Sequence, residues 1–207
     1  MYARTTTVRG DPRSVDEGIE YVRNTVWPRL QDMSGCVGMS MLADRAGGRC
    51  IVTAAWATDE ALQASAASVH EIRSRAAEVL RADAVDVQEW EIAALHRVHP
   101  AGDGACTRVI WTAVEPAGAD GMIDAFRTGL LPRLENLPGF CSVSLMADRN
   151  TGKGSVAITY ESRDALAQSR AMGTAMRDQF VSAMGAQVTD VAEFEVAVAH
   201  LRVPEMA

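Results

Sequence analysis

The chain has little positive charge and no long apolar run. Its 207 residues include 20 Lys and Arg against 27 Asp and Glu, a net charge of −7. Without a basic excess it lacks a surface for neutralising phosphates, which argues against nucleic acid and against an anionic membrane as partners. No apolar stretch reaches the ~20 residues of a membrane helix, and residues 1–7 lack an apolar signal core, so we expect a cytoplasmic protein.

Paired cysteines and the common catalytic signatures are also missing. The four cysteines form no C-x-x-C motif: they are Cys36, Cys50, Cys106 and Cys141. We therefore expect free thiols that act as small buried residues. The chain contains no phosphate-binding loop, no dinucleotide glycine fingerprint and no serine nucleophile elbow, so these motifs assign it to no enzyme class.

An internal repeat is the strongest signal that the sequence does contain. Residues 4–96 align with residues 108–200 without a gap, at a constant offset of 104 (108 − 4), and more than a quarter of the aligned positions are identical. No cysteine is matched between the copies, which argues against an ancestral disulfide or metal framework. We predict one domain over residues 1–97, a linker over 98–105 and a second domain over 106–207.

Hydrophobic periodicity gives the same element order in each copy. In the first copy we predict strands over 5–9, 37–43, 50–56 and 85–95, a helix after Pro12 with a capping box from Ser14 to Glu17, a hairpin turn that begins at Asp44, and a second helix capped by Thr58, which Ser162 matches in the second copy. The first helix has an apolar stripe in each copy: Ile19, Val22, Val26 and Leu30 in the first, and Ile123, Phe126, Leu130 and Leu134 in the second. Ala66 and, in the second copy, Met172 belong to the predicted inward stripe of the second helix. The order βαββαβ predicts an α+β fold of two ferredoxin-like repeats, whose antiparallel sheets pack together as a barrel.

The last strand of each copy alternates between two kinds of side chain. Glu89 and Glu91, matched by Glu193 and Glu195, alternate with a face that contains Trp90 or Phe194. We place the aromatic face toward the helices and the carboxylates on the opposite face, where the matched Arg4 and Arg108 are candidate partners.

Several strings resemble the antibiotic biosynthesis monooxygenase-like group of the dimeric α/β-barrel superfamily. They are Pro138-Gly139-Phe140, the turn from Asp148 to Lys153, the stretch from Trp56 to Ser65, and the closing strands from Val87 to Ile92 and from Val191 to Val196. The resemblance implies that a fused pair is an internal pseudo-dimer, with further homo-oligomerisation left open. It also implies a small aromatic ligand, because the group includes cofactor-free oxygenases of quinol- or anthrone-like aromatics, haem-degrading enzymes and proteins without activity.

The resemblance to haem-degrading members is incomplete. That branch uses an Asn in strand one and a Trp and a His in helix two. The first strand has no Asn in either copy, Ser65 and Ser169 stand at the Trp position, and His70 corresponds to Thr174. We therefore predict no cofactor, while haem binding without breakdown stays an alternative.

Candidate site residues come from the repeat-matched positions. His96 and His200 are matched at the end of the last strand and are candidate general bases. Trp56, Tyr160, Trp90 and Phe194 are the candidate wall of an aromatic pocket between helices and sheet. His96 and His99 resemble metal ligands in spacing, but the second copy has no counterpart of His99, so we predict no metal.

Three functions fit these residues. The first is a cofactor-independent oxygenase, the second a non-catalytic ligand-binding or scaffold protein, and the third a haem-binding protein. The histidines also fit a purely structural role at strand ends, and the aromatics fit a plain core. The volume of the space between helices and sheet in each copy discriminates among these functions, because collapsed space in both favours the non-catalytic protein.

Overall fold

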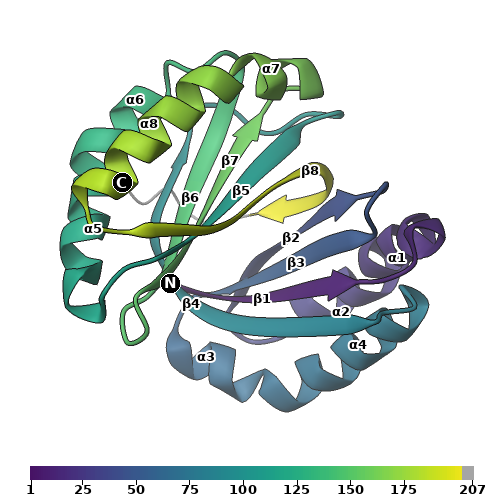
Figure 1. The fold of residues 1–207 in the computed structure, drawn as a ribbon. Coiled ribbons are helices and arrows are strands. Elements are labelled where there is room, and N and C mark those ends of the chain that lie inside the picture. The colour runs from purple at the N-terminus through teal and green to yellow at the C-terminus, as the bar shows by residue number, and fades with distance from the viewer. Residues whose placement is uncertain (202–207) are drawn as a thin grey trace. The chain divides into compact units, whose positions relative to one another are not determined.

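The computed structural model describes residues 1–201, and its elements recur along the chain at the offset of the sequence repeat (Figure 1). The first repeat contains β1 (Tyr2–Arg9), η1 (Pro12–Ser14), α1 (Val15–Tyr21), the π-helical turn η2 (Val22–Val26), α2 (Trp27–Gln31), β2 (Cys36–Asp44), β3 (Arg49–Trp56), α3 (Asp59–Ala64), α4 (Ala66–Val79) and β4 (Ala84–Arg97). The second contains β5 (Cys106–Ala113), η3 (Pro116–Gly118), α5 (Ala119–Ala125), the π-helical turn η4 (Phe126–Leu130), α6 (Leu131–Leu134), β6 (Phe140–Asp148), β7 (Lys153–Tyr160), α7 (Arg163–Gln168), α8 (Arg170–Ala183) and β8 (Gln187–Leu201).

The strands are hydrogen-bonded in the order β1-β3-β2-β8-β5-β7-β6-β4, which is the order of a closed antiparallel barrel. The last strand of each repeat therefore pairs with the second strand of the other, β4 with β6 and β8 with β2. The predicted fold class, α+β with two ferredoxin-like βαββαβ repeats joined through an antiparallel barrel, is confirmed.

The chain forms two compact units that share the long last strands. Unit 1 contains residues 1–90 and the described residues 196–201, and unit 2 contains residues 91–195. Both β4 and β8 run from one unit into the other. As a result, the end of β8, with His200, belongs to unit 1, and the end of β4, with His96, belongs to unit 2.

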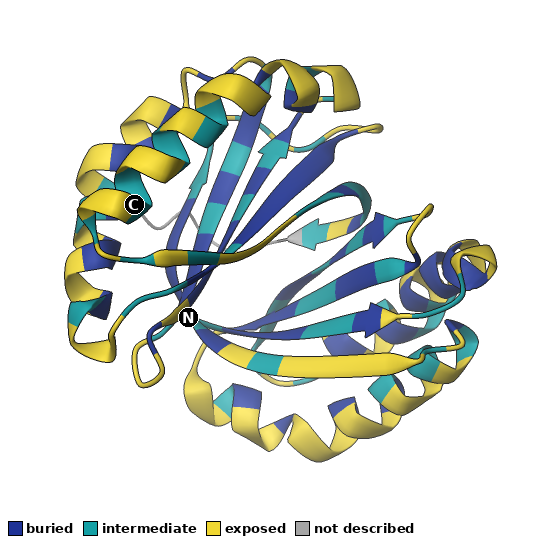
Figure 2. Ribbon diagram, in the orientation of Figure 1, coloured by how far each residue is buried: buried dark blue, intermediate teal, exposed yellow. Residues whose placement is uncertain are grey.

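Each unit has its own apolar core between its helices and its strands. In unit 1 the stripe predicted for the first helix, Ile19, Val22, Val26 and Leu30, is buried against the sheet. In unit 2 the corresponding buried positions include Ile123, Phe126, Leu130 and Leu134. In both units the outward faces of the helices are exposed (Figure 2). Period-3.6 patterning therefore located the buried side of this helix in both copies.

Most of the predicted turns and helix caps are present in the structure, and one cap is not. Asp44 Oδ1 accepts hydrogen bonds from the N–H groups of Ala46 and Gly47, at 3.1 and 2.9 Å, as expected for the hairpin turn. The Thr58 hydroxyl caps α3 by accepting from Ala61 N, and Ser162 does the same for α7. The capping box at Ser14 was wrong. Its side chain makes no cap bond, and Asp11 accepts from Arg13 N at the preceding turn instead.

The inward stripe of the second helix was predicted with two errors. Ala66 is exposed and Met172 is 50% exposed. The buried positions are Ser65 and Ser169, where α3 and α7 end and α4 and α8 begin. A serine can occupy this buried place because its hydroxyl is satisfied: Ser65 Oγ donates to Leu62 O at 2.6 Å.

Candidate ligand site

In each repeat a buried arginine pairs with a more exposed glutamate of the last strand and fixes the orientation of that strand. Arg4 is 4% exposed and donates to Glu89 Oε1 from Nε at 2.9 Å and from Nη2 at 2.6 Å. It also donates to Ser65 Oγ and to Leu62 O, at 2.9 and 3.0 Å. The pairing with the last-strand carboxylate is confirmed, but its face was wrong. Because Arg4 contacts the α3–α4 junction, Glu89 lies on the helix side of the sheet.

The second repeat contains the same network. Arg108 donates to Glu193 Oε1 at 3.1 and 2.9 Å, to Ser169 Oγ at 3.3 Å and to Leu166 O at 3.0 Å. Burial alone would raise the pKa of Glu89. The hydrogen bonds from Gln63 and Arg4, together with the charge of Arg4, outweigh burial and hold that pKa below its ordinary value.

The four predicted pocket aromatics divide between the two faces of the sheet. Trp56 and Tyr160 are fully buried on the helix side, since Arg108 lies over the Tyr160 ring and Trp56 belongs to the core of unit 1. Trp90 lies on the opposite face, where its Nε1 donates to Thr5 Oγ1 at 2.8 Å. Phe194 is likewise opposite the Arg108 side, because it pairs with Thr107. The expected face of Trp90 and Phe194 was wrong, and a pocket role for the four stays a prediction.

The space between helices and sheet is small in both units. In unit 1 the cavity between α4 and the sheet, bounded by Arg4, Arg73 and apolar side chains, has a volume of about 50 Å³. Its counterpart in unit 2, which includes Phe126 and Phe180, has a volume of about 30 Å³. Each has room for one or two water molecules, whereas ligand pockets measure ~300–1,000 Å³. Neither is lined by any of the four predicted aromatics.

A matched arginine contacts the strand just before each histidine, and in β4 a β-bulge lies at the same place. The pairing of β4 with β6 slips between Ile92 and Ala94, and the carbonyl of Ala93 accepts hydrogen bonds from Arg127. In unit 1 Arg23 donates to the matched carbonyl of Ala197 at 3.0 Å. Both arginines lie in π-helical turns, η2 and η4, which often mark functional regions. Arg23 and Arg127 therefore help to position the strand ends that carry His200 and His96.

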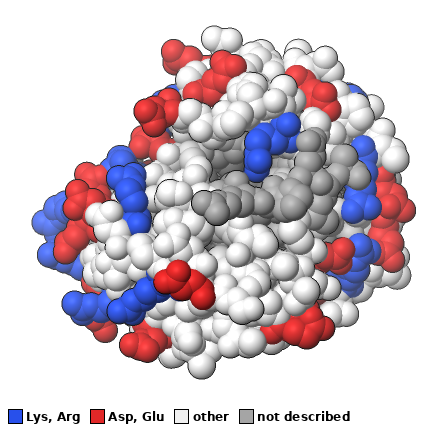
Figure 3. All heavy atoms as spheres, turned by 180° about the vertical axis from the view of Figure 1, so that it is seen from behind, with Lys and Arg blue, Asp and Glu red and all other residues white. Residues whose placement is uncertain are grey.

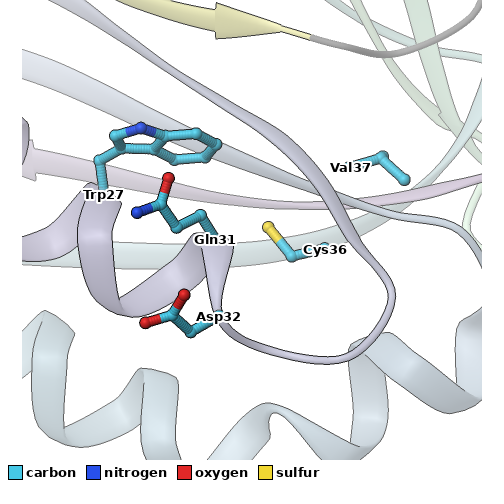
Figure 4. A pocket seen from close by; sticks show the side chains of 5 residues that line it. All are labelled: Trp27, Gln31, Asp32, Cys36 and Val37. Carbon is cyan, nitrogen blue, oxygen red and sulfur yellow. The ribbon is translucent and has the colours of Figure 1, made fainter.

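His200 lies against an aromatic ring in unit 1. Its imidazole stacks on the indole of Trp27, with ring centroids 4.7 Å apart and planes 7° apart. Trp27 is partly exposed and also lines a surface cavity of about 460 Å³ together with Gln31, Asp32, Cys36 and Val37 (Figure 4). We call this cavity the Trp27 cavity. Its volume falls within the range of small-molecule sites.

His96 has different surroundings in unit 2. Its Nε2 is 3.1 Å from Glu135 Oε1, its side chain is 18% exposed, and its ring lies 6.4 Å from that of Phe140. Phe140 is 5% exposed and stands at the position that Cys36 occupies in the first repeat. Phe140 therefore fills in unit 2 the position where Cys36 borders open space. The structure does not bring the two histidines into one compact unit, and their catalytic assignment stays a prediction.

Sequence reasoning missed the residues that distinguish the two sites. Trp27, Asp32 and Cys36 correspond to Leu131, Asn136 and Phe140, so the sites differ where the repeats do not match. Two signals were available in the alignment. Arg23 and Arg127 are the same residue at matched positions, which indicated the same structural role in both repeats. The smaller Cys36 stands where the second repeat has Phe140, which indicated less side-chain volume in the first repeat.

The four cysteines and the charged surface also have defined places in the structure. All four cysteines are free thiols, and burial raises the pKa of Cys50 and of Cys141 to about 11. Within residues 1–201 no group of three or more His, Cys, Asp or Glu side chains is arranged to hold a metal ion. No helix in this part of the chain is long and apolar enough to cross a membrane. On the face seen in Figure 3, acidic and basic side chains are interspersed among the described residues.

Comparison with solved structures defines the class of fold. An anthrone oxidase-like protein superposes with a TM-score of 0.67 at 14% identity, over 97% of this chain and 91% of its own. A ferredoxin-fold protein of Listeria monocytogenes 4b F2365 related to antibiotic biosynthesis monooxygenases gives 0.55 at 8% identity, over 95% and 94%. The haem-degrading enzyme LmHde of Listeria monocytogenes gives 0.51 at 8% identity, over 95% and 99%. The chain shares its fold, a ferredoxin-like α/β barrel, with these three proteins.

Sequence comparison places the chain more narrowly. Rv2558 of Mycobacterium tuberculosis H37Rv, an uncharacterized protein, is 49% identical over 207 residues, all of this chain and 87% of its own length. Rv2557 of the same strain, also an uncharacterized protein, is 44% identical over 206 residues, with 92% of its length covered. The chain belongs to the family of these two proteins. No protein-family model matches it.

Proposed function

We propose that the protein binds one small planar aromatic molecule per chain in the Trp27 cavity. The observation that carries this proposal is a cavity of about 460 Å³ beside a partly exposed indole, at a position that Phe140 fills in the other repeat. Planar ligands gain from stacking on an aromatic ring, and the ring of Trp27 is already held in place by His200.

A cofactor-independent oxygenation is the catalytic form of this function. A base takes a proton from a C–H group of an anthrone- or quinol-like substrate, and the resulting carbanion forms a C–O bond with O₂, which is reduced by two electrons to a peroxide. The protonated base returns its proton to the peroxide, and the hydroperoxide then loses water, with breakage of its O–O bond, to leave a carbonyl. His200 is the base that we propose for this step, because its imidazole lies against a ring that lines the cavity. The fold shared with an anthrone oxidase-like protein supports this chemistry.

Binding without catalysis is the second candidate. The cavities of about 50 and 30 Å³ between helices and sheet favour it, because the family resemblance expects the substrate pocket there. In that case the Trp27 cavity is a binding site only.

Calorimetric titration with 1-naphthol, followed by oxygen-uptake measurements with anthrone and hydroquinone, tests the proposal. We expect one binding site per chain that Trp27→Leu weakens and Leu131→Trp leaves unchanged. Oxygen uptake that His200→Ala abolishes and His96→Ala preserves supports the oxygenase, while binding without uptake supports the second candidate. Absence of 1-naphthol binding overturns the proposed site. A Soret band on titration with hemin would instead favour haem binding.

A further inference from the structure

We propose that the Trp27 cavity selects a planar aromatic cation, and that Asp32 is the residue that makes the selection. This inference rests on the proposed function, that the cavity holds an aromatic ligand, and adds the charge of that ligand. It follows from three observations: the place of Asp32 on its helix, the residue at the matched place in the other repeat, and the chemistry of the cavity wall.

Asp32 stands at an unfavourable position for a carboxylate. It is the C-cap of α2, at the end of a helical run, where the aligned peptide dipoles produce partial negative charge. Its side chain is exposed and lines the cavity. Within residues 1–201 no hydrogen bond or ion pair engages this carboxylate. Figure 4 shows it on the same side of the helix end as the amide of Gln31, below the indole.

The residue of the second repeat that matches Asp32 stabilises the end of its helix. Asn136 occupies the matched place, and its Nδ2 donates to Pro132 O at 3.0 Å, which caps the end of the helix. An ionised Asp has no hydrogen to donate, so Asp32 cannot form the same cap. Asp32 therefore forms no hydrogen bond that caps the helix through a side-chain donor, and it adds negative charge at the end of the helix where the dipole is already negative. Local choices that oppose stability concentrate at functional sites.

The remaining wall of the cavity also suits a cation. The face of an indole attracts positive charge more strongly than any other side-chain ring. His200 stacks on one face of Trp27, and the part of the indole that lines the cavity is left for a ligand. The other described lining residues, Gln31, Cys36 and Val37, bring no positive charge. The net charge of −7 on the chain further favours the approach of cations.

Two probes of the same shape and different charge test this inference: 1-methylquinolinium and its neutral isostere 1-methylnaphthalene, titrated by calorimetry into the full chain. We expect the wild-type protein to bind the cation about tenfold more tightly than the neutral probe. Asp32→Asn should weaken binding of the cation about tenfold, so that the preference is lost, and should raise Tm, because Asn restores the helix cap. The matched control, Asn136→Asp, should lower Tm and leave both affinities unchanged.

Each other outcome has a separate meaning. Equal affinities for the two probes in the wild-type protein overturn the cation selection and leave the proposed aromatic site standing. A cation preference that survives Asp32→Asn overturns the role of Asp32. If neither probe binds, the proposed function itself fails. Since Asp32→Asn should raise Tm, a loss of cation binding in that variant cannot be attributed to unfolding.

Discussion

The strand ends that carry His200 and His96 are matched in sequence and differ in their surroundings. His200 stacks on Trp27 beside a cavity of about 460 Å³, whereas His96 pairs with Glu135 next to a buried Phe140. The arginine that donates to the backbone carbonyl of the preceding strand, Ala197 or Ala93, is identical in both repeats. In unit 2 the position is therefore filled by Phe140 as part of the core, whereas in unit 1 the matched position borders the Trp27 cavity. A fused pair can specialise its two sites independently, which a homodimer of identical chains cannot do.

The largest expected difference is in stability, at the position occupied by Cys36 and Phe140. Phe140→Ala should lower the free energy of unfolding by about 3–5 kcal/mol, because it leaves a void in the core of unit 2. Cys36→Ala should cost less than about 1 kcal/mol, since Cys36 already borders open space. Urea unfolding of both variants measures the difference. Equal losses would contradict the assignment of one filled and one open site.

The next effect concerns the Arg4–Glu89 pair of unit 1. Glu89→Gln should cost about 2 kcal/mol at pH 7, because it leaves the buried Arg4 without its charged acceptor. The folded-state pKa of Glu89 is lowered, so its stabilisation is complete above the unfolded-state pKa of about 4.3 and is lost as pH falls through the folded value.

The difference in stability between wild-type and Glu89→Gln proteins should therefore shrink in acid. Denaturant unfolding between pH 7 and pH 3 measures it, and Glu78→Gln, at an exposed ion pair with Arg75, is the control. A difference that stays constant over this range would show that the carboxylate charge contributes nothing to the pair.

A smaller effect is expected on ligand affinity. Trp27→Leu places the residue of the second repeat in the first, and it should weaken binding of an aromatic cation about tenfold through loss of the indole face. Leu131→Trp should leave affinity unchanged, because Phe140 still fills the neighbouring space. Equal effects of the two exchanges would mean that ligand binds at neither position or at both.

The smallest effect should be the same in both repeats. Thr58→Ala and Ser162→Ala each remove the hydroxyl that caps a helix, α3 or α7, and each should cost about 1 kcal/mol. Thermal unfolding of the two variants gives the comparison. A loss at one cap only would show that the repeats differ in their framework and not just at the strand-end sites.

The sequence allowed the framework to be predicted because two copies constrain each other. Two kinds of feature were predictable: those set by neighbouring residues and those set by residues matched between the copies. The first kind includes the hairpin turns and the helix caps at Thr58 and Ser162, and the second includes the element order and the pairing of Arg4 with Glu89. The face of the last strand was wrong for a physical reason. Side chains on both faces of this strand have partners, since Glu89 accepts from Arg4 and Trp90 donates to Thr5. Alternation therefore separates Glu89 from Trp90 without telling which of them meets the helices.

The candidate site was harder to predict because it depends on volume. Substitution of Phe140 by Cys36 shows lost bulk in the alignment, but only the folded chain shows whether neighbours fill the space. The bulge at Ala93 likewise has no sequence signature, although it precedes His96 directly. Matched residues therefore indicated the shared framework, and unmatched residues indicated where the two copies differ in packing.

Calorimetric titration of 1-methylquinolinium into wild-type protein and into Cys36→Phe tests the central claim most directly, that the open site lies beside Trp27. The wild-type protein should bind one cation per chain, and Cys36→Phe, which copies the residue of the second repeat, should weaken binding by at least about tenfold. The folded state of the variant is checked by its Tm. Unchanged affinity and stoichiometry in Cys36→Phe would contradict the claim.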